Sequence, residues 1–170
     1  MTLEKWALIA EIIGSVAIVI SLIFVGVQLR ANTSATRSAT ASAASSATSA
    51  WYNAMGTSAQ ASALFFNFFN DPAALSPEER LQAVFIVHGA LVNFQTSFML
   101  ANEGTLDSQI KDAILEALVV VKDKPGFKYY WEQRRAFFYA EFQEYVEQLT
   151  KVERTTSKDI FRHGVSNRPA

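Results

Sequence analysis

The stretch WALIAEIIGSVAIVISLIFVGVQL, residues 6–29, decides the fold of this chain. It contains 24 residues and a single charged one, Glu11, near its start. At about 1.5 Å of rise per residue, such a helix reaches about 36 Å and crosses the roughly 30 Å hydrocarbon core of a bilayer with some tilt. The sequence therefore predicts a transmembrane anchor over residues 1–30, with membrane lipids as partners.

The flanks of this run favour a retained anchor over a cleaved signal peptide. The run is longer than a signal peptide's apolar region of about 7–15 residues, and no small-residue cleavage site stands where Arg30 follows it. A cleaved signal and a buried soluble helix remain the alternatives. Arg30 and Arg37 on the C-terminal side, against Lys5 on the other, weakly favour the bulk of the chain in the cytoplasm.

Small residues recur along the anchor at spacings of 3, 4, 3 and 4, namely Ala7, Ala10, Gly14, Ala17 and Ser21. We call this set the membrane stripe. Small side chains let two membrane helices approach closely, so we expect contact with another membrane subunit or with a second copy. The alternative is that Ala, Gly and Ser are simply common in membrane helices. Glu11 is interpreted as an interfacial carboxylate, or as a residue that pairs with a partner.

Residues 31–70 begin with an Ala-, Ser- and Thr-rich region that is either a flexible linker or a helix continuing out of the membrane. Four alanines at spacings of 4, 3 and 4 favour the helix, since a linker need not keep one face: Ala43, Ala47, Ala50 and Ala54. We call these the alanine seam. The sequence predicts one continuous or gently bent helix to about Asn70, with the seam packing against other helices.

Residues 71–152 are predicted to form a helical bundle, followed by a polar tail at 153–170. Ser76 and Glu79 form a capping box around Pro77, which predicts a helix start, and Gly104 predicts its end near Asn102. This helix is apolar enough to be considered as a second membrane span, but polar residues along its length favour a buried core helix. Further helices are expected over 105–121 or 107–121, 127–138 and 140–152.

The chain shows no alternating strand pattern, so the predicted class is all-α. We expect a single N-terminal transmembrane helix that continues into a long juxtamembrane helix packed with a small helical bundle. Aromatic residues cluster over 65–69 and 127–139, and their meeting would form the base of the core. An aromatic-lined pocket for a lipid or small molecule is the alternative.

Composition excludes several chemistries. The absence of cysteine removes thiol catalysis and Cys-based metal sites, and a net charge of −1 argues against nucleic-acid binding through a basic surface. His88 is expected to be a satisfied core residue, and the other histidine, His163, lies in the tail. The usual helical metal spacings, the nucleophile elbow and phosphate loops are missing, so we predict no enzyme activity, no metal and no cofactor.

The densest group of polar and aromatic residues is Trp131, Glu132, Arg134 and Arg135. Such a group usually forms a structural network, in which an arginine stacks on the tryptophan or pairs with a carboxylate. The sharper alternative is that these residues hold a small anionic ligand.

Several segments carry a resemblance to a known family: 6–33, 65–67, LSPEER at 75–80, NEGTLD at 102–107 with Gln95 upstream, and PGFKYYWEQRRAFFYAEF at 125–142. The chain resembles, over about residues 4–148, a widespread group of small bacterial membrane-anchored proteins of unknown function. The anchor motif is the most specific part. The resemblance implies a bacterial inner-membrane protein with a helical domain, and it implies no activity and no catalytic residue.

Two hypotheses on function follow. The first is a non-enzymatic single-pass protein that acts as an accessory, assembly or scaffolding subunit of a larger membrane complex, docking through the membrane stripe and the alanine seam. The second is a membrane-anchored ligand-binding or sensor module with an aromatic-lined helical pocket.

Overall fold

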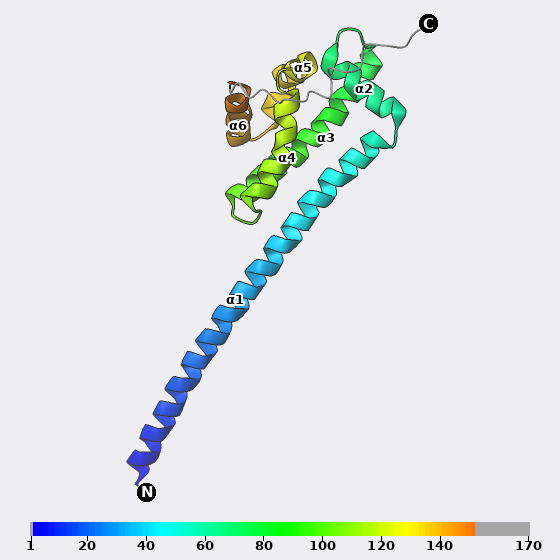
Figure 1. Cartoon of the computed structure of the whole chain (residues 1–170). Coiled ribbons are helices and arrows are strands. Elements are labelled where there is room, and N and C mark those ends of the chain that lie inside the picture. The colour runs from blue at the N-terminus through cyan, green and yellow to red at the C-terminus, as the bar shows by residue number, and fades with distance from the viewer. Residues whose placement is uncertain (1, 152–170) are drawn as a thin grey trace. The chain divides into compact units, whose positions relative to one another are not determined.

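The computed structural model describes residues 2–151, so the predicted polar tail at 153–170 and His163 lie outside the described residues. Every regular element in the described range is a helix, which confirms the all-α class (Figure 1). The elements are α1 (Leu3–Gly56), α2 (Ala59–Asn70), α3 (Pro77–Asn102), α4 (Ser108–Val121), α5 (Pro125–Arg134), the 3-10 helix η1 (Arg135–Phe137) and α6 (Ala140–Lys151). The chain divides into two compact units, Met1–Ala39 and Thr40–Ala170.

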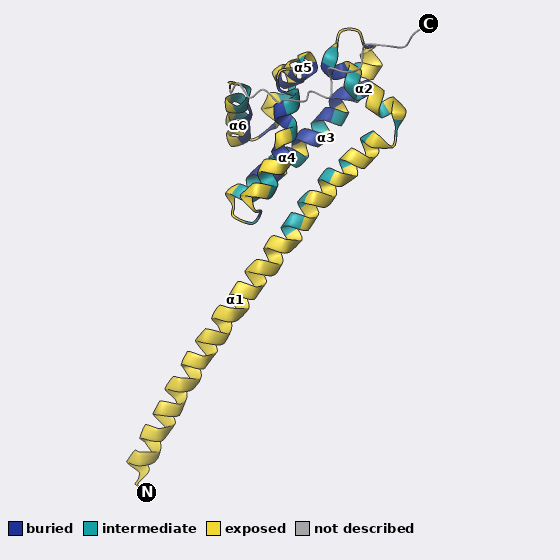
Figure 2. Ribbon diagram, in the orientation of Figure 1, coloured by how far each residue is buried: buried dark blue, intermediate teal, exposed yellow. Residues whose placement is uncertain are grey.

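The first unit consists of the N-terminal part of α1. All its described residues are exposed (Figure 2). They include large apolar residues such as Ile12, Leu22 and Phe24. Within the described residues, α1 and α3 are the helices long and apolar enough to cross a membrane. The most apolar window of α1 is 0% buried within the chain, against 39% for that of α3. The rest of the chain therefore covers part of the apolar window of α3 but none of that of α1.

The structure differs from the expectation of one helix reaching Asn70, because α1 ends at Gly56 and α2 begins at Ala59. Ser58 adopts an extended backbone, and its side chain caps α2 by accepting a hydrogen bond from the Ala61 amide at 3.1 Å. The Ser62 hydroxyl donates to the carbonyl of Met55 at 2.6 Å and so closes the end of α1. A serine that offers its side chain as a cap competes with helix continuation, which explains the break.

Local signals around α3 behave as predicted. Glu79 accepts from the Ser76 amide at 2.9 Å, and the Ser76 hydroxyl accepts from the Glu79 amide at 3.2 Å, which completes the capping box. Hydrogen bonding of the Glu79 carboxylate to Ser76, from the backbone amide first and from the side chain second, lowers the pKa of Glu79. Gly104 follows α3 with a φ of +73°, a conformation that glycine adopts without steric cost. The predicted bounds of this helix are confirmed.

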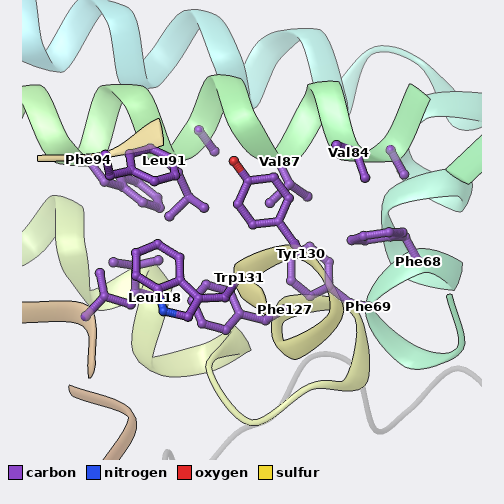
Figure 3. Packing of buried hydrophobic residues seen from close by; sticks show 14 of the residues in the cluster. Phe68, Phe69, Val84, Val87, Leu91, Phe94, Leu118, Phe127, Tyr130 and Trp131 are labelled. Atoms are coloured by element: carbon purple, nitrogen blue, oxygen red, sulfur yellow. The ribbon is translucent and has the colours of Figure 1, made fainter. Parts of the chain in front are cut away.

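The core of the second unit lies between α2, α3, α4, α5 and α6, with the last turns of α1 packed against it (Figure 2). Phe68 and Phe69 of α2 share one buried cluster with Phe127 and Tyr130 of α5 (Figure 3). The backbones of α2 and α5 approach closely at Gly126, where a Cβ would collide with the backbone of Phe68. This contact joins helices that are distant in the sequence.

Candidate functional site

The polar–aromatic group is organised by Trp131, which α5 turns into the core. Its ring stacks on Phe127 with centroids 6.0 Å apart and on Phe138 at 5.6 Å. The side chain is 9% exposed, and its Nε1 is buried without an acceptor in the described part of the chain (Figure 3). Burying an indole N–H without a hydrogen bond costs free energy, so this atom marks a site where a polar partner would stabilise the protein.

The two arginines of the group point to different partners. The guanidinium of Arg134 lies 5.2 Å from the ring centroid of Phe137, while Arg135 donates to the Glu147 carboxylate of α6 at 3.1 Å. Arg135 thus pairs with a carboxylate, as expected of a structural network, whereas Arg134 lies over Phe137 and not over Trp131. Arg135, but not Arg134, shares a surface hollow with Trp131 and Glu132 among the described lining residues.

That hollow has a volume of about 560 Å³ and also contains Lys122, Asp123 and Lys128 in its walls. Lys122 was not singled out by sequence reasoning, yet its side chain is 4% exposed and its ammonium pairs with Asp123 at 2.9 Å. It caps the C-terminal end of α4, where a cation also interacts favourably with the helix dipole. The signal in the sequence that could have drawn attention to Lys122 was its position directly after the end of a predicted helix. Its burial could not be predicted, because lysine is rarely buried and its neighbours in the sequence do not indicate burial.

His88 and Tyr130 form a polar pair inside the bundle. The His88 Nδ1 and the Tyr130 hydroxyl are 2.5 Å apart, and His88 also packs against Phe138. Burial raises the pKa of the Tyr130 phenol, which therefore keeps its proton and can donate it to Nδ1. The structure confirms the expectation that His88 has a partner, and places it half-buried at the edge of the core.

The membrane stripe and the alanine seam are both exposed on α1. In the stripe, a Cβ on Gly14 would meet no atom within 4 Å. In the second unit, the partly buried residues of α1 are Thr40, Ala41, Ala44, Thr48, Trp51 and Met55, and the last four each lie one position after a seam alanine. The seam is therefore not the face that packs on the bundle, and its role toward a partner stays a prediction.

An apolar cavity of about 150 Å³ lies between α1, α2, α3, α4 and α5. Aromatic side chains in its walls include Trp51, Phe65, Phe69 and Phe94. The Trp51 indole N–H donates to the Ile86 carbonyl at 3.2 Å, so the polar edge of this ring is already satisfied. The cavity matches the predicted aromatic-lined pocket in character, but it is smaller than the roughly 300–1,000 Å³ of typical small-molecule sites.

In the part of the chain that the structure describes, no three His, Cys, Asp or Glu residues are grouped so that they could hold a metal ion. Comparison of the chain with protein-family models, with curated proteins and with solved structures finds no match. The assignment of function therefore depends on the physical properties of the surfaces described above.

Proposed function

We propose that this chain is a single-pass membrane protein that acts, without enzymatic activity, as an accessory, assembly or scaffolding subunit of a larger membrane complex. The observation that carries the proposal is the uncovered apolar part of α1, whose most apolar window is 0% buried within the chain. Removing such a surface from water is strongly favourable, so it requires lipid or another apolar helix as its environment. A bacterial inner membrane, with the second unit in the cytoplasm, is the location we propose.

The exposed small-residue faces of α1 support a role in assembly. In lipid, helices associate through close packing, which small side chains permit, rather than through the hydrophobic effect. The membrane stripe supplies such a face, and the alanine seam supplies one in the second unit that the bundle leaves open. Other membrane subunits, or further copies of this chain, are the partners that these faces fit.

The test is extraction of the native protein from membranes in mild detergent, followed by native mass spectrometry. We expect the protein to resist alkaline carbonate and to elute as a complex. Replacing Gly14 of the stripe by Ile should dissociate the complex, whereas Gly26→Ile, at a glycine equally open but outside the stripe, should not. Recovery of the wild-type chain as a lone monomer would contradict the proposal.

The second candidate is a ligand-binding or sensor module, and one observation favours it. The hollow of about 560 Å³ beside Trp131 has the volume of small-molecule sites. Its walls contain three cations, Lys122, Lys128 and Arg135, against the two acids Asp123 and Glu132, a net charge of +1. A small anion would suit these cations. The purified protein should then release a small anionic molecule on denaturation, and Lys128→Gln should reduce its amount. If no molecule is released, the ligand-binding role is refuted and the assembly role is the remaining candidate.

A further inference from the structure

A hollow of about 340 Å³ lies between α4 and α6, in a part of the bundle that neither candidate function uses. Its walls consist of Asp112, Leu115, Glu116 and Val119 of α4 and Tyr145, Gln148 and Leu149 of α6. Positions three and four residues apart lie on the same side of a helix, so one face of each helix is turned toward the hollow. From Asp112 to Val119 the hollow follows α4 for about 10 Å.

The apolar residues of this hollow are held in place by the core. Leu115 and Val119 are buried and form its floor. The ring of Tyr145 packs against Phe98 of α3, with centroids 4.9 Å apart, so this wall is also fixed. An apolar cavity of roughly 150 Å³ is enough to hold a benzene ring. The larger volume of this hollow therefore has room for a phenyl side chain and an aliphatic neighbour.

The charged residues in the walls of the hollow are acidic. Asp112 and Glu116 lie four positions apart on α4, and the described residues of the walls include no lysine or arginine. Lys111, which is not a wall residue, pairs with Asp112 at 3.1 Å, yet the Asp112 side chain is 66% exposed. The residues of α4 carry a net charge of −1 and those of α6 a net charge of −2. Both helices therefore favour a basic occupant.

The chain contains a segment of matching chemistry directly after α6. This helix ends at Lys151, two positions after Leu149 of the hollow, and residues 152–170 follow outside the described range. The segment contains four lysines and arginines against two acids, a net charge of +2. Its middle reads KDIFR, residues 158–162, in which two bases four positions apart flank an apolar pair. In the hollow, two acids four positions apart flank Leu115.

We propose that the segment 152–170 of the same chain binds in this hollow, with Phe161 on its apolar floor and with Lys158 and Arg162 beside the two carboxylates. Phe161 is ten positions after Lys151, and an extended chain of that length spans up to roughly 35 Å, enough to return to a hollow beside α6. A short tether gives the segment an effective concentration in the millimolar range, so weak contacts suffice. This inference goes beyond the proposed function and does not depend on it.

The test measures the distance between the segment and α4 in the full chain in detergent. Because the chain contains no cysteine, Ala113→Cys at an exposed position of α4 and Ser166→Cys in the segment can each carry one nitroxide label. Pulsed electron paramagnetic resonance then gives the distribution of distances between the two labels. The hollow variant combines Asp112→Lys and Glu116→Lys. The matched control combines Glu78→Lys and Glu103→Lys, two exposed acids outside the walls of the hollow.

We expect a narrow component at short distance in the labelled parent chain. The hollow variant and Phe161→Ala should each reduce this component by about fivefold or more, whereas the control variant should leave it unchanged. Adding Lys158→Glu and Arg162→Glu to the hollow variant should restore it, because opposite charges then face each other again. The four substituted acids are exposed, so these variants should fold, and circular dichroism checks this.

A broad distribution in the parent chain, without the short component, would overturn the inference. A short component that persists in both the hollow variant and Phe161→Ala would overturn it as well. Dilution with unlabelled chain separates binding within one molecule from exchange between two. If the short component disappears on dilution, the segment enters the hollow of a second copy, and the proposed occupant from the same chain is wrong.

Discussion

Two glycines of the bundle should respond to the same substitution with opposite signs. Gly126 is the second residue of α5, and a Cβ there would lie far inside contact distance of the Phe68 carbonyl and 2.8 Å from the Cα of Phe69. Gly89 lies in the middle of α3, is exposed, and would place its Cβ against no atom within 4 Å. Substituting alanine at these two positions therefore separates the effect of helix propensity on stability from the effect of packing.

The magnitudes follow from these two environments. Replacing glycine by alanine inside a helix gains about 1 kcal/mol, so Gly89→Ala should raise the free energy of unfolding by up to that amount. At Gly126 the colliding atoms belong to the backbone of α2, and no rotamer change moves them away. Forcing extra volume into a packed site costs about 1–3 kcal/mol or more when the backbone must shift. After the propensity gain, Gly126→Ala should lose roughly 2 kcal/mol.

The measurement is urea unfolding of the full chain in detergent, followed by tryptophan fluorescence, since Trp51 and Trp131 both report on the bundle. With a slope of about 2 kcal/mol per molar urea, Gly126→Ala should lower the midpoint by about 1 M, and Gly89→Ala should raise it by up to about 0.5 M. A Gly126→Ala variant as stable as the wild type would refute the close approach of α2 and α5. Two shifts of the same sign would refute the separation of the two effects.

Four further substitutions test the local chemistry. Gly104→Ala should cost about 1–2 kcal/mol in the same unfolding assay, because a left-handed φ of +73° strains an L side chain, and an unchanged midpoint would contradict this. Ser76→Ala should cost about 1 kcal/mol through loss of the cap of α3. The pKa of Glu79 is lower in the folded state than its ordinary value of 4.5. The ionised carboxylate therefore stabilises the fold above pH 4.5, and this contribution is lost as the pH falls through the folded pKa. Glu79→Gln should flatten that part of the stability–pH profile. Because the pKa of Tyr130 is raised in the folded state, the stability of the fold should decline as the pH rises above 10. Tyr130→Phe should remove this decline. The same variant should lose about 1 kcal/mol of stability at neutral pH, because it lacks the hydrogen bond to His88.

The capping box of α3, the ends of α3 and α4 and the helical class were predictable because they depend on neighbours within about one turn. Ser76, Pro77 and Glu79 act on the first turn of α3 through hydrogen bonds between residues three apart. Gly104 ends the same helix through its own backbone conformation. Asp107 likewise caps α4, with its side chain accepting from the Gln109 amide at 2.8 Å. None of these features requires knowledge of what the helix packs against.

The break at Gly56 and the inward face of α1 were not predictable in the same way. An alanine pattern such as the seam at residues 43–54 is compatible with either side of a helix facing the bundle, because alanine gains little from burial. Trp51 decides the matter, since its large ring and its N–H both find partners on α3 and α2. The face of α1 that carries Trp51 therefore packs against the bundle, and the alanine seam is left exposed.

By itself, the sequence determined the uncovered apolar helix at the N-terminus, the all-helical class and the local start and end of α3 and α4. The tertiary structure decided which distant residues meet: Gly126 against Phe68, His88 against Tyr130, and Arg135 against Glu147. The physical reason is range. Apolar length, caps and glycine conformations act within a few residues, whereas the choice of packing face depends on the shape and polarity of a surface that exists only after the helices have assembled.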